Sequence, residues 1–404
     1  MCESLSQRFS VLDKALISTQ EFWRTEPFHS SINESLPWLN HPALCEFLTS
    51  LEVEDIEQLK GDTSKLVECL TPLIPALTSL WAQCELDSLL LTGEHDTQHL
   101  SVGIPGRKWQ QITAMGEAAL RVNRSGQDWL EWCAGKGYLG QWLAQQSQLP
   151  VISFEWQDSL CVAGQALADK HQLSMTFIQG DALSDDCHRV FKPNQHAVAL
   201  HACGDLHAHL IEHVCQQGLS GVTLSPCCYH LIQDDDYQPL STLGKHSQLH
   251  LSKTDLRIPL QETVTGGERV KRHRELEMTY RLGFDCLLQD ASNQQGYTSI
   301  PSIKKSQLSQ GFASFCQWAK EQRNLDVTLE DLDYWQQRAQ QRFIQMERLS
   351  LVQQAFRRPI EMWLVCDKAL RLEQAGYDVS LSTFCPRDIT PRNILIQAIE
   401  NRSL

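Results

Sequence analysis

Three glycines between a short strand-like segment and a helix-like segment have the spacing of a ligand-binding turn. Gly135, Gly137 and Gly140 follow residues 128–132, where polar and bulky side chains alternate as in a strand. Residues 139–143 then place apolar side chains at helical intervals. In such a strand–turn–helix unit, glycines allow a ligand to approach the backbone closely and the helix start offers free N–H groups. We therefore predict that the turn binds a nucleotide-like ligand.

Carboxylates near this turn narrow the class of ligand. Glu155 ends a predicted strand eighteen residues after Gly137, where it can accept hydrogen bonds from ribose hydroxyls. Asp181 ends the next predicted strand, where it suits the exocyclic amine of an adenine. Glu131, four residues before Gly135, would repel a pyrophosphate but attract an ammonium group. Three carboxylates around one pocket favour S-adenosylmethionine over NAD.

The predicted cofactor contacts extend beyond these acids to the turn and to the neighbouring strand ends. They are Glu131, Cys133, Gly135, Gly137, Glu155, Asp181, Ala182 and His201.

Two further clusters of reactive side chains end what we predict to be the fourth and fifth strands. The segments 201–205, His-Ala-Cys-Gly-Asp, and 225–230, Ser-Pro-Cys-Cys-Tyr-His, should face the transferred methyl group together. Methyl transfer is a direct displacement that depends on alignment, and a hydroxyl acceptor also needs a general base. His201, Asp205 and His230 are candidate bases, while Tyr229 can stack on a planar acceptor or donate a hydrogen bond. The candidate catalytic residues are His201, Asp205, Cys227, Tyr229 and His230.

The cysteines of these clusters allow three interpretations. Cys227 after Pro226 resembles the nucleophile of RNA 5-methylcytosine enzymes, although those enzymes carry it on the preceding strand. A zinc site could use His201, Cys203, Cys227, Cys228 and His230. Adjacent cysteines on extended backbone point in opposite directions, however, and no paired Cys-x-x-Cys spacing is present. We therefore favour a packing role for Cys203 and Cys228 and predict no metal.

Strand-like segments alternate with amphipathic helical segments through the middle of the chain. The predicted strands are 128–132, 151–155, 175–181, 197–201 and 221–225. This alternation is typical of a doubly wound α/β fold with a parallel sheet, whose ligands bind at the carboxyl ends of the strands. Residues 46–100 and 307–348 show helical periodicity, and residues 362–366 and 379–384 are predicted to be two late strands. Residues 390–398 could add a short last strand.

Four sequence elements resemble those of a known family. They are Ala134–Leu139 (Ala-Gly-Lys-Gly-Tyr-Leu), His201–Leu206 (His-Ala-Cys-Gly-Asp-Leu), Cys227–Tyr229 (Cys-Cys-Tyr) and Pro391–Asn393 (Pro-Arg-Asn). Residues 131–140 resemble motif I of class I S-adenosylmethionine-dependent methyltransferases, with Cys133 where many members have the first glycine. The four elements together resemble a branch containing eukaryotic methyltransferase-like proteins and transfer-RNA ribose 2′-O-methyltransferases. The resemblance covers residues from about 130 to 400.

The resemblance implies a Rossmann-like, seven-stranded sheet closed by a C-terminal antiparallel hairpin, which the two late strands would form. We predict a helical N-terminal module at residues 1–100, followed by a class I methyltransferase domain at 101–404. Insertions are expected at about 232–275 and 300–350. The whole is predicted to be an α/β enzyme that uses S-adenosyl-L-methionine.

The acceptor molecule is suggested by basic residues. A net charge of −14 argues against a broad nucleic-acid-binding surface. Arg269–Arg274 nevertheless forms a basic cluster in a predicted loop, and Arg107 and Lys108 lie in a turn-rich segment before a helix that should begin near Gln110. These groups favour an RNA acceptor (tRNA or rRNA). A protein acceptor, and a non-catalytic scaffold that retains the fold, are the alternatives.

The cellular location is predicted from what the chain shows at its start and along its length. No cationic segment leads into an apolar one at the N-terminus, and no apolar run has the length of a membrane span. Fifteen cysteines without an export signal favour reduced thiols. We predict a cytoplasmic protein without a membrane partner.

Overall fold

The computed structural model describes residues 4–33, 35–93, 98–123, 127–261, 268–292 and 297–401. Contacts divide the chain into two units. The first comprises Met1–Ile17, Leu80–Leu260 and Arg358–Leu404, and the second comprises Ser18–Ser79 and Gln261–Arg357. The predicted boundary between a module at 1–100 and a domain at 101–404 stays a prediction.

The first unit contains the sheet and the helices packed on it. Its elements are α1 (Leu5–Ser18), η1 (Gln98–Ser101), α8 (Gly106–Val122), β1 (Asp128–Trp132), α9 (Tyr138–Ser147), β2 (Val151–Glu155), α10 (Asp158–Lys170), β3 (Met175–Gln179), η2 (Asp185–Val190), β4 (Gln195–Cys203), α11 (Asp205–Gln217), β5 (Gly221–Cys227), α12 (Thr242–His246), η3 (Asp255–Leu260), β6 (Tyr377–Thr383) and β7 (Ile394–Glu400).

The second unit is helical in its described residues. It contains α2 (Gln20–Trp23), α3 (Pro27–Ser30), α4 (Pro42–Ser50), α5 (Val53–Gly61), α6 (Thr63–Leu70), α13 (Glu268–Ser292), α14 (Lys305–Leu308) and α15 (Phe312–Arg323). Helices α7 (Ala76–Ala82) and α16 (Leu332–Gln374) contribute residues to both units.

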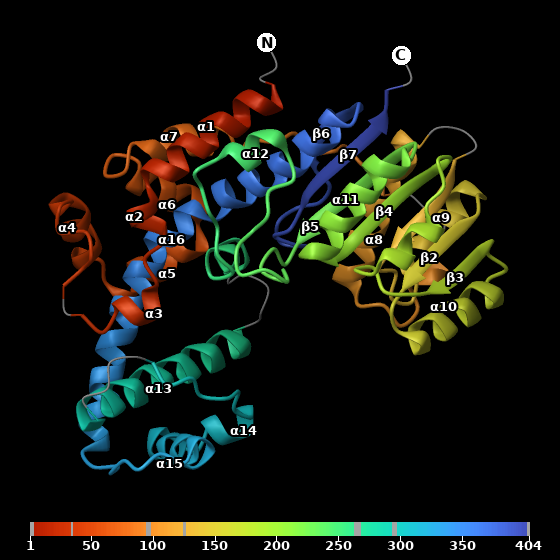
Figure 1. Cartoon of the computed structure of the whole chain (residues 1–404). Coiled ribbons are helices and arrows are strands. Elements are labelled where there is room, and N and C mark those ends of the chain that lie inside the picture. Colours follow the sequence, from red (N-terminus) through yellow and green to blue (C-terminus); the bar gives the residue numbers. More distant parts are fainter. Residues whose placement is uncertain are drawn as a thin grey trace. The chain divides into compact units, whose positions relative to one another are not determined.

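Within the described residues, seven strands form one sheet in the order β3-β2-β1-β4-β5-β7-β6 (Figure 1). Strands β3, β2, β1, β4 and β5 are parallel, whereas β7 is antiparallel to both β5 and β6. The order runs outward in both directions from the pair β1–β4, which is the switch point where doubly wound sheets bind ligands. This topology confirms the predicted Rossmann-like sheet with a C-terminal antiparallel hairpin.

One of the two predicted hairpin strands is wrong. The predicted strand 379–384 corresponds to β6, and the predicted short last strand 390–398 overlaps β7. Residues 362–366 lie inside α16 and are not a strand; β6 and β7 form the hairpin instead. The error has a physical cause, because Met362–Cys366 is buried on every side, and a short apolar run of this kind is common to central strands and buried helix turns. α16 continues through Pro359.

The predicted helical region 46–100 is also interrupted. Residues 83–93 are not helical. Ser88 forms a bridge with Thr383 of β6, and backbone hydrogen bonds join Leu89 N to Thr383 O and Thr383 N to Asp87 O, both at 2.9 Å. β6 is the edge strand of the sheet, so this extended segment covers backbone groups that would otherwise be open.

A buried apolar layer holds α8 and α9 against the sheet. Its buried members include Ile112, Met115, Ala118 and Ala119 of α8, Leu139, Trp142 and Leu143 of α9, and Trp129, Val151, Val198 and Leu395 of the strands. The layer fixes the starts of both helices over the carboxyl edge of β1 and β4, and this places the glycine turn and the first turn of α8 next to the switch point.

The second unit has its own core between α13 and α15, formed around Phe284, Phe312 and Phe315. Near it, the buried Arg342 and Asp285 side chains form an ion pair of 2.5 Å. No helix in the described ranges is long and apolar enough to cross a membrane.

Candidate active site

The turn after β1 has three residues in the left-handed backbone region. Cys133, Gly135 and Gly137 have φ values of 55°, 59° and 69°. At Gly135 an added Cβ would project into open space, so the backbone there is accessible to a ligand. Gly137 is the N-cap of α9, which aims the first N–H groups of the helix toward this space. The predicted turn therefore has the geometry of a ligand cradle.

Glu155 and Asp181 follow the carboxyl ends of the neighbouring strands β2 and β3. The Glu155 carboxylate accepts hydrogen bonds from the Gly135 N–H at 2.8 Å and from the Gln157 N–H at 2.9 Å. Asp181 lies two residues beyond the end of β3 and accepts from the Leu183 N–H at 2.9 Å, next to the buried Ala182. Both acids therefore present acceptor oxygens at the edge of the sheet that holds the glycine turn.

Glu131 lies beneath the start of α9. Its side chain is 4% exposed, and its Oε2 accepts a hydrogen bond of 2.8 Å from Ser153 Oγ. Burial raises the pKa of Glu131 to about 7, while hydrogen bonds from Ser153 and from the Gly140 and Leu139 N–H groups act in the opposite direction. A Cβ at Gly140 would lie 2.4 Å from Oε2, so the third glycine makes room for this carboxyl group. The predicted contact of Glu131 with an ammonium group stays a prediction.

His201 stands at the end of β4 with a positive φ of 70°, beside an irregularity in the pairing of β4 and β5. Its Nε2 lies 3.0 Å from Gln111 Oε1, and the Gln111 amide donates to Ile389 O. Gln111 is therefore the acceptor, so His201 carries its proton on Nε2 and has a lone pair on Nδ1. Burial and the nearby Lys108 charge lower the pKa of His201, which favours the neutral ring. The geometry fits a general base.

The other predicted catalytic residues face different surroundings. Asp205 begins α11 and accepts from the Gln233 N–H at 2.7 Å. Tyr229 is 2% exposed, and its hydroxyl lies 3.4 Å from Glu361 Oε1 on α16. His230 is half-buried, and no partner for its Nδ1 occurs among the described residues. The structure thus turns the Tyr229 hydroxyl into the protein interior, and the catalytic roles of all three residues stay predictions.

A cavity of about 270 Å³ lies beside Asp205 and Tyr229. It is also lined by Lys368, a fully buried residue of α16 whose Nζ donates to Tyr237 OH at 2.8 Å. Burial lowers the pKa of Lys368 to about 8. Sequence reasoning missed this lysine, because α16 was not recognised as a helix at that point.

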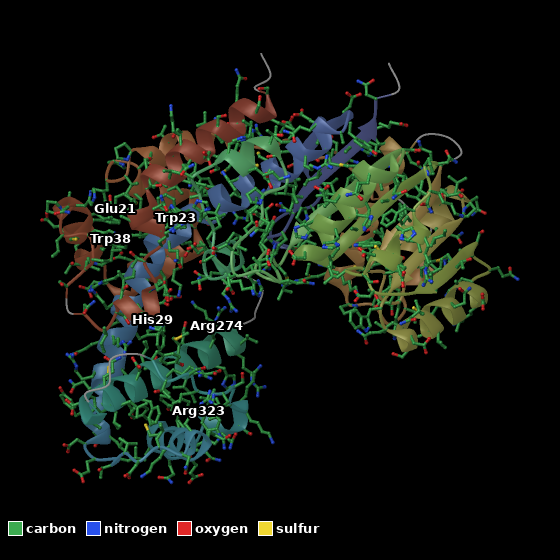
Figure 2. All side chains as sticks on the ribbon, viewed as in Figure 1. Glu21, Trp23, His29, Trp38, Arg274 and Arg323 are labelled. Atoms are coloured by element: carbon green, nitrogen blue, oxygen red, sulfur yellow. The ribbon has the colours of Figure 1, made fainter. Side chains whose placement is uncertain are left out.

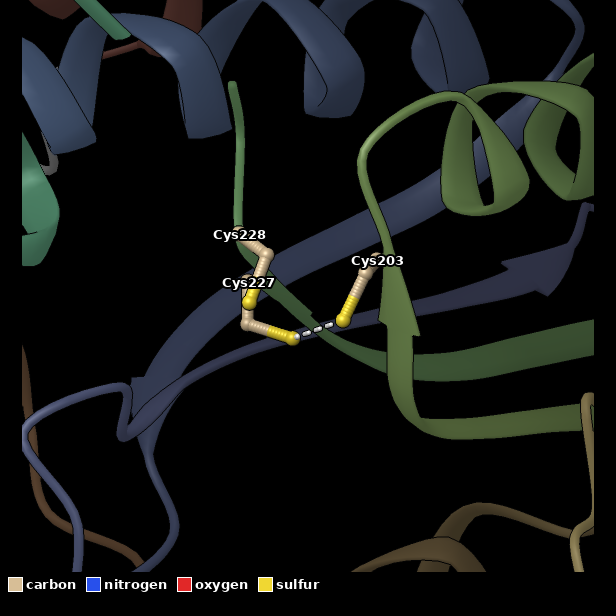
Figure 3. A group of neighbouring side chains, drawn as sticks. All are labelled: Cys203, Cys227 and Cys228. Carbon is tan, nitrogen blue, oxygen red and sulfur yellow. Dashed lines mark hydrogen bonds between the residues drawn. The ribbon is translucent and has the colours of Figure 1, made fainter. Parts of the chain in front are cut away.

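The three cysteines at the strand ends converge. The sulfur atoms of Cys203, Cys227 and Cys228 all lie within 4.8 Å of one another, and those of Cys203 and Cys227 are 3.4 Å apart (Figure 3). Hydrogen bonds from the other two thiols lower the pKa of Cys228, and Arg392 acts in the same direction. The pKa of Cys227 is raised. The ring nitrogens of His201 and His230 are not part of this group.

Two residues near the site were not among the predicted contacts. Gln111 sets the tautomer of His201, and nothing in its sequence position marks it. Arg392 belongs to the Pro-Arg-Asn element, which was a usable signal, and its charge reaches Cys203, Cys228 and His201.

The basic residues proposed for RNA binding lie on helices. Arg107 and Lys108 are in the first turn of α8, which begins at Gly106 and not near Gln110 as predicted. Lys108 Nζ lies 5.3 Å from the ring centre of Tyr138, directly after the glycine turn. Arg269–Arg274 occupies the first turns of α13 instead of a loop; Figure 2 labels Arg274 on this helix. The rest of that predicted loop lies partly outside the described residues.

The carboxylates, the open glycine turn and the helix start fit the ribose, adenine and methionine parts of S-adenosylmethionine. This fit is chemical, since the strand ends offer acceptors for hydroxyl and amine groups and the helix start offers donors for a carboxylate.

Comparison with known proteins defines the class of this part of the chain. Residues 107–235 match a family model described as "Methyltransferase domain". They are therefore a methyltransferase domain, the enzyme class for which S-adenosyl-L-methionine is the cofactor. No curated protein matches the chain.

Several solved structures are similar to part of the chain. The tRNA (uracil-54, C5)-methyltransferase of Pyrococcus abyssi is 15% identical over 29% of this chain and 28% of its own, with a TM-score of 0.25. An RNA methyltransferase of Salinibacter ruber is 16% identical over 34% of this chain and 86% of its own, with a TM-score of 0.25. TrmN of Thermus thermophilus is 18% identical over 30% of this chain and 41% of its own, with a TM-score of 0.24. The match thus spans less than a third of the Pyrococcus abyssi enzyme.

Proposed function

We propose that the protein transfers the methyl group of S-adenosyl-L-methionine to RNA, with tRNA or rRNA as the substrate. The four sequence elements support placement in the branch that includes the transfer-RNA ribose 2′-O-methyltransferases. The observation that carries the RNA proposal is the exposure of Arg269, Arg272 and Arg274 on α13, together with exposed Arg107 and Lys108 on α8. Exposed guanidinium and ammonium groups are what phosphate contacts require.

His201 is the proposed general base. When bound, S-adenosyl-L-methionine supplies an electrophilic methyl group. His201 Nδ1 would take the proton of the acceptor hydroxyl as that oxygen receives the methyl group. Gln111 holds the imidazole in the tautomer that this step needs. A neutral His201 suits the role, because a protonated ring could not accept the proton.

Labelled cofactor identifies the acceptor class. The full chain is incubated with S-adenosyl-L-methionine carrying a labelled methyl group and with total RNA or total protein from a strain that lacks this protein. We expect label in RNA. Label only in protein would replace RNA by a protein substrate. Calorimetry with the cofactor tests the scaffold alternative, since absence of binding at high micromolar ligand would exclude an active enzyme.

The basic residues give a second test. Joint replacement of Arg269, Arg272 and Arg274 by alanine should weaken tRNA binding roughly 10-fold or more and reduce its salt dependence. The matched control replaces the exposed Lys65, Lys304 and Lys305 of the same unit and makes the same change in charge. Equal binding by both triple variants would contradict an RNA contact at α13.

A further inference from the structure

Three cysteine sulfur atoms meet where β4 and β5 end. Cys203 and Cys227 are register partners on these parallel strands, and their sulfur atoms are 3.4 Å apart. Cys228 follows directly, and all three sulfur atoms lie within 4.8 Å of one another. Cys203 and Cys228 are half-buried and Cys227 is buried. Two of the three cysteines therefore keep some exposed surface.

The backbone at Cys228 makes this convergence possible. Successive side chains on a strand point to opposite faces, so Cys227 and Cys228 would diverge if β5 simply continued. Cys228 instead has a φ of 46°, in the left-handed region. A residue other than glycine in this region costs about 1 kcal/mol or more, and such strained positions cluster at functional sites. The left-handed backbone of Cys228 therefore turns its thiol to the same side as the thiol of Cys227.

The sulfur separations match a metal-binding geometry. Zinc binds thiolate sulfur at about 2.3 Å with tetrahedral angles, which places two ligand sulfur atoms roughly 3.8 Å apart. The observed values, 3.4 Å for Cys203–Cys227 and at most 4.8 Å within the trio, bracket that separation. Small rotations of the side chains suffice to surround an ion.

The local charges also suit a cation with three thiolate ligands. A divalent ion and three thiolates have a net charge of −1, and the Arg392 guanidinium lies within electrostatic reach of Cys203 and Cys228. Cys203 Sγ also lies 3.3 Å from the backbone carbonyl oxygen of His201.

We propose that Cys203, Cys227 and Cys228 bind one thiophilic divalent ion, Zn²⁺, through three thiolates and leave the fourth position open. Sites with three protein ligands and an open position are typical of catalytic zinc, whose open position takes water or a substrate atom. The proposal replaces the packing role expected for Cys203 and Cys228. It does not depend on methyl transfer, because metal binding is measured without cofactor or acceptor.

Metal content tests the proposal directly. The full chain is purified without chelator and its zinc is measured by elemental mass spectrometry; we expect about one ion per chain. After chelation, titration with Co²⁺ should produce a sulfur-to-cobalt charge-transfer band in the near ultraviolet. Cys203→Ser and Cys228→Ser should each weaken metal binding roughly 10-fold or more.

The matched control is Cys69→Ser, a half-buried cysteine of α6 outside the trio, which should retain the full metal content. Zinc should also raise the melting temperature of the unmodified chain and of Cys69→Ser more than that of a folded Cys228→Ser variant at the same zinc concentration. Circular dichroism establishes that each variant is folded. Metal retained after joint replacement of all three cysteines would overturn the proposal. Absence of zinc and of the cobalt band from the unmodified protein would also overturn it, including the case in which Cys203 and Cys227 form a disulfide.

Discussion

The Glu155 carboxylate accepts a 2.8 Å hydrogen bond from the backbone N–H of Gly135, joining the end of β2 to the turn after β1. The other Glu155 oxygen is held by the Gln157 N–H, so two backbone donors fix the orientation of the carboxylate. The ribose acceptor predicted from sequence is therefore positioned by the same turn that should cradle the cofactor. Because these backbone groups already hold the carboxylate in place, ligand binding loses less side-chain entropy.

Replacing Glu155 by alanine should weaken S-adenosyl-L-methionine binding roughly 10-fold or more, because ribose hydroxyls would lose a charged acceptor. Isothermal titration calorimetry measures the change. Asp158→Ala is the control, since Asp158 is an exposed acid in the first turn of α10, three residues further on. Equal affinities for the Glu155→Ala variant and the unmodified protein would show that the ribose lies elsewhere.

At position 133, substitution by glycine should destabilise the protein less than substitution by a β-branched residue. Its φ of 55° is in the left-handed region, where a β-branched residue is strained most. We expect Cys133→Gly to change the free energy of unfolding by less than about 1 kcal/mol, because relief of strain offsets the added freedom of the unfolded chain. Cys133→Val should be destabilised by roughly 1–2 kcal/mol more. Urea unfolding compares the two, and a Val variant as stable as the Gly variant would contradict the assigned backbone conformation.

Glu131 should make stability depend on pH. Burial raises its folded pKa to about 7 from the ordinary value of 4.5, so the folded protein holds a proton that the unfolded chain releases. The stability that this group contributes is present below pH 4.5 and is lost as the pH rises toward 7. Glu131→Gln mimics the protonated form at every pH. The variant should therefore gain stability relative to the unmodified protein between pH 5 and 8, by up to about 3 kcal/mol.

Urea unfolding of the unmodified protein and of Glu131→Gln at pH 5 and at pH 8 measures the difference in their free energies of unfolding. Using the difference between the two proteins removes the effect of other titrating groups. A constant difference across the pH range would show that Glu131 is ionised in the folded state.

Asp367 should be a strong determinant of stability in the first unit. This fully buried residue of α16 accepts hydrogen bonds from Tyr237 OH, Leu240 N, and the N–H and hydroxyl groups of Ser241. Asp367→Ala would leave these donors without an acceptor, and we expect a loss of about 3 kcal/mol or more. Thermal or urea unfolding checks this value against Asp186→Ala, an exposed acid in η2. A loss below about 1 kcal/mol would mean that water replaces the carboxylate.

The parallel part of the fold could be predicted from local patterns. The predicted strands 128–132 and 151–155 have the same bounds as β1 and β2, because alternating or continuous apolar residues between turn residues are a local signal. The meeting of Glu155 and Asp181 at one edge also follows from sequence, since all parallel strands end there. The hairpin was misassigned at 362–366 because a fully buried run has no polar face from which to determine its period.

The sequence by itself determined the glycine turn, the acids at the strand ends and the positions of the parallel strands along the chain, because each depends on residue type and short-range periodicity. Only the tertiary structure decided the role of residues whose orientation depends on distant contacts. Tyr229 points toward Glu361, which is 132 residues away along the chain. Cys228 joins Cys203 and Cys227 because its backbone is left-handed, a conformation that its residue type does not predict. The cofactor turn could thus be predicted from the sequence, whereas backbone conformation and strand pairing determine the arrangement of the thiols.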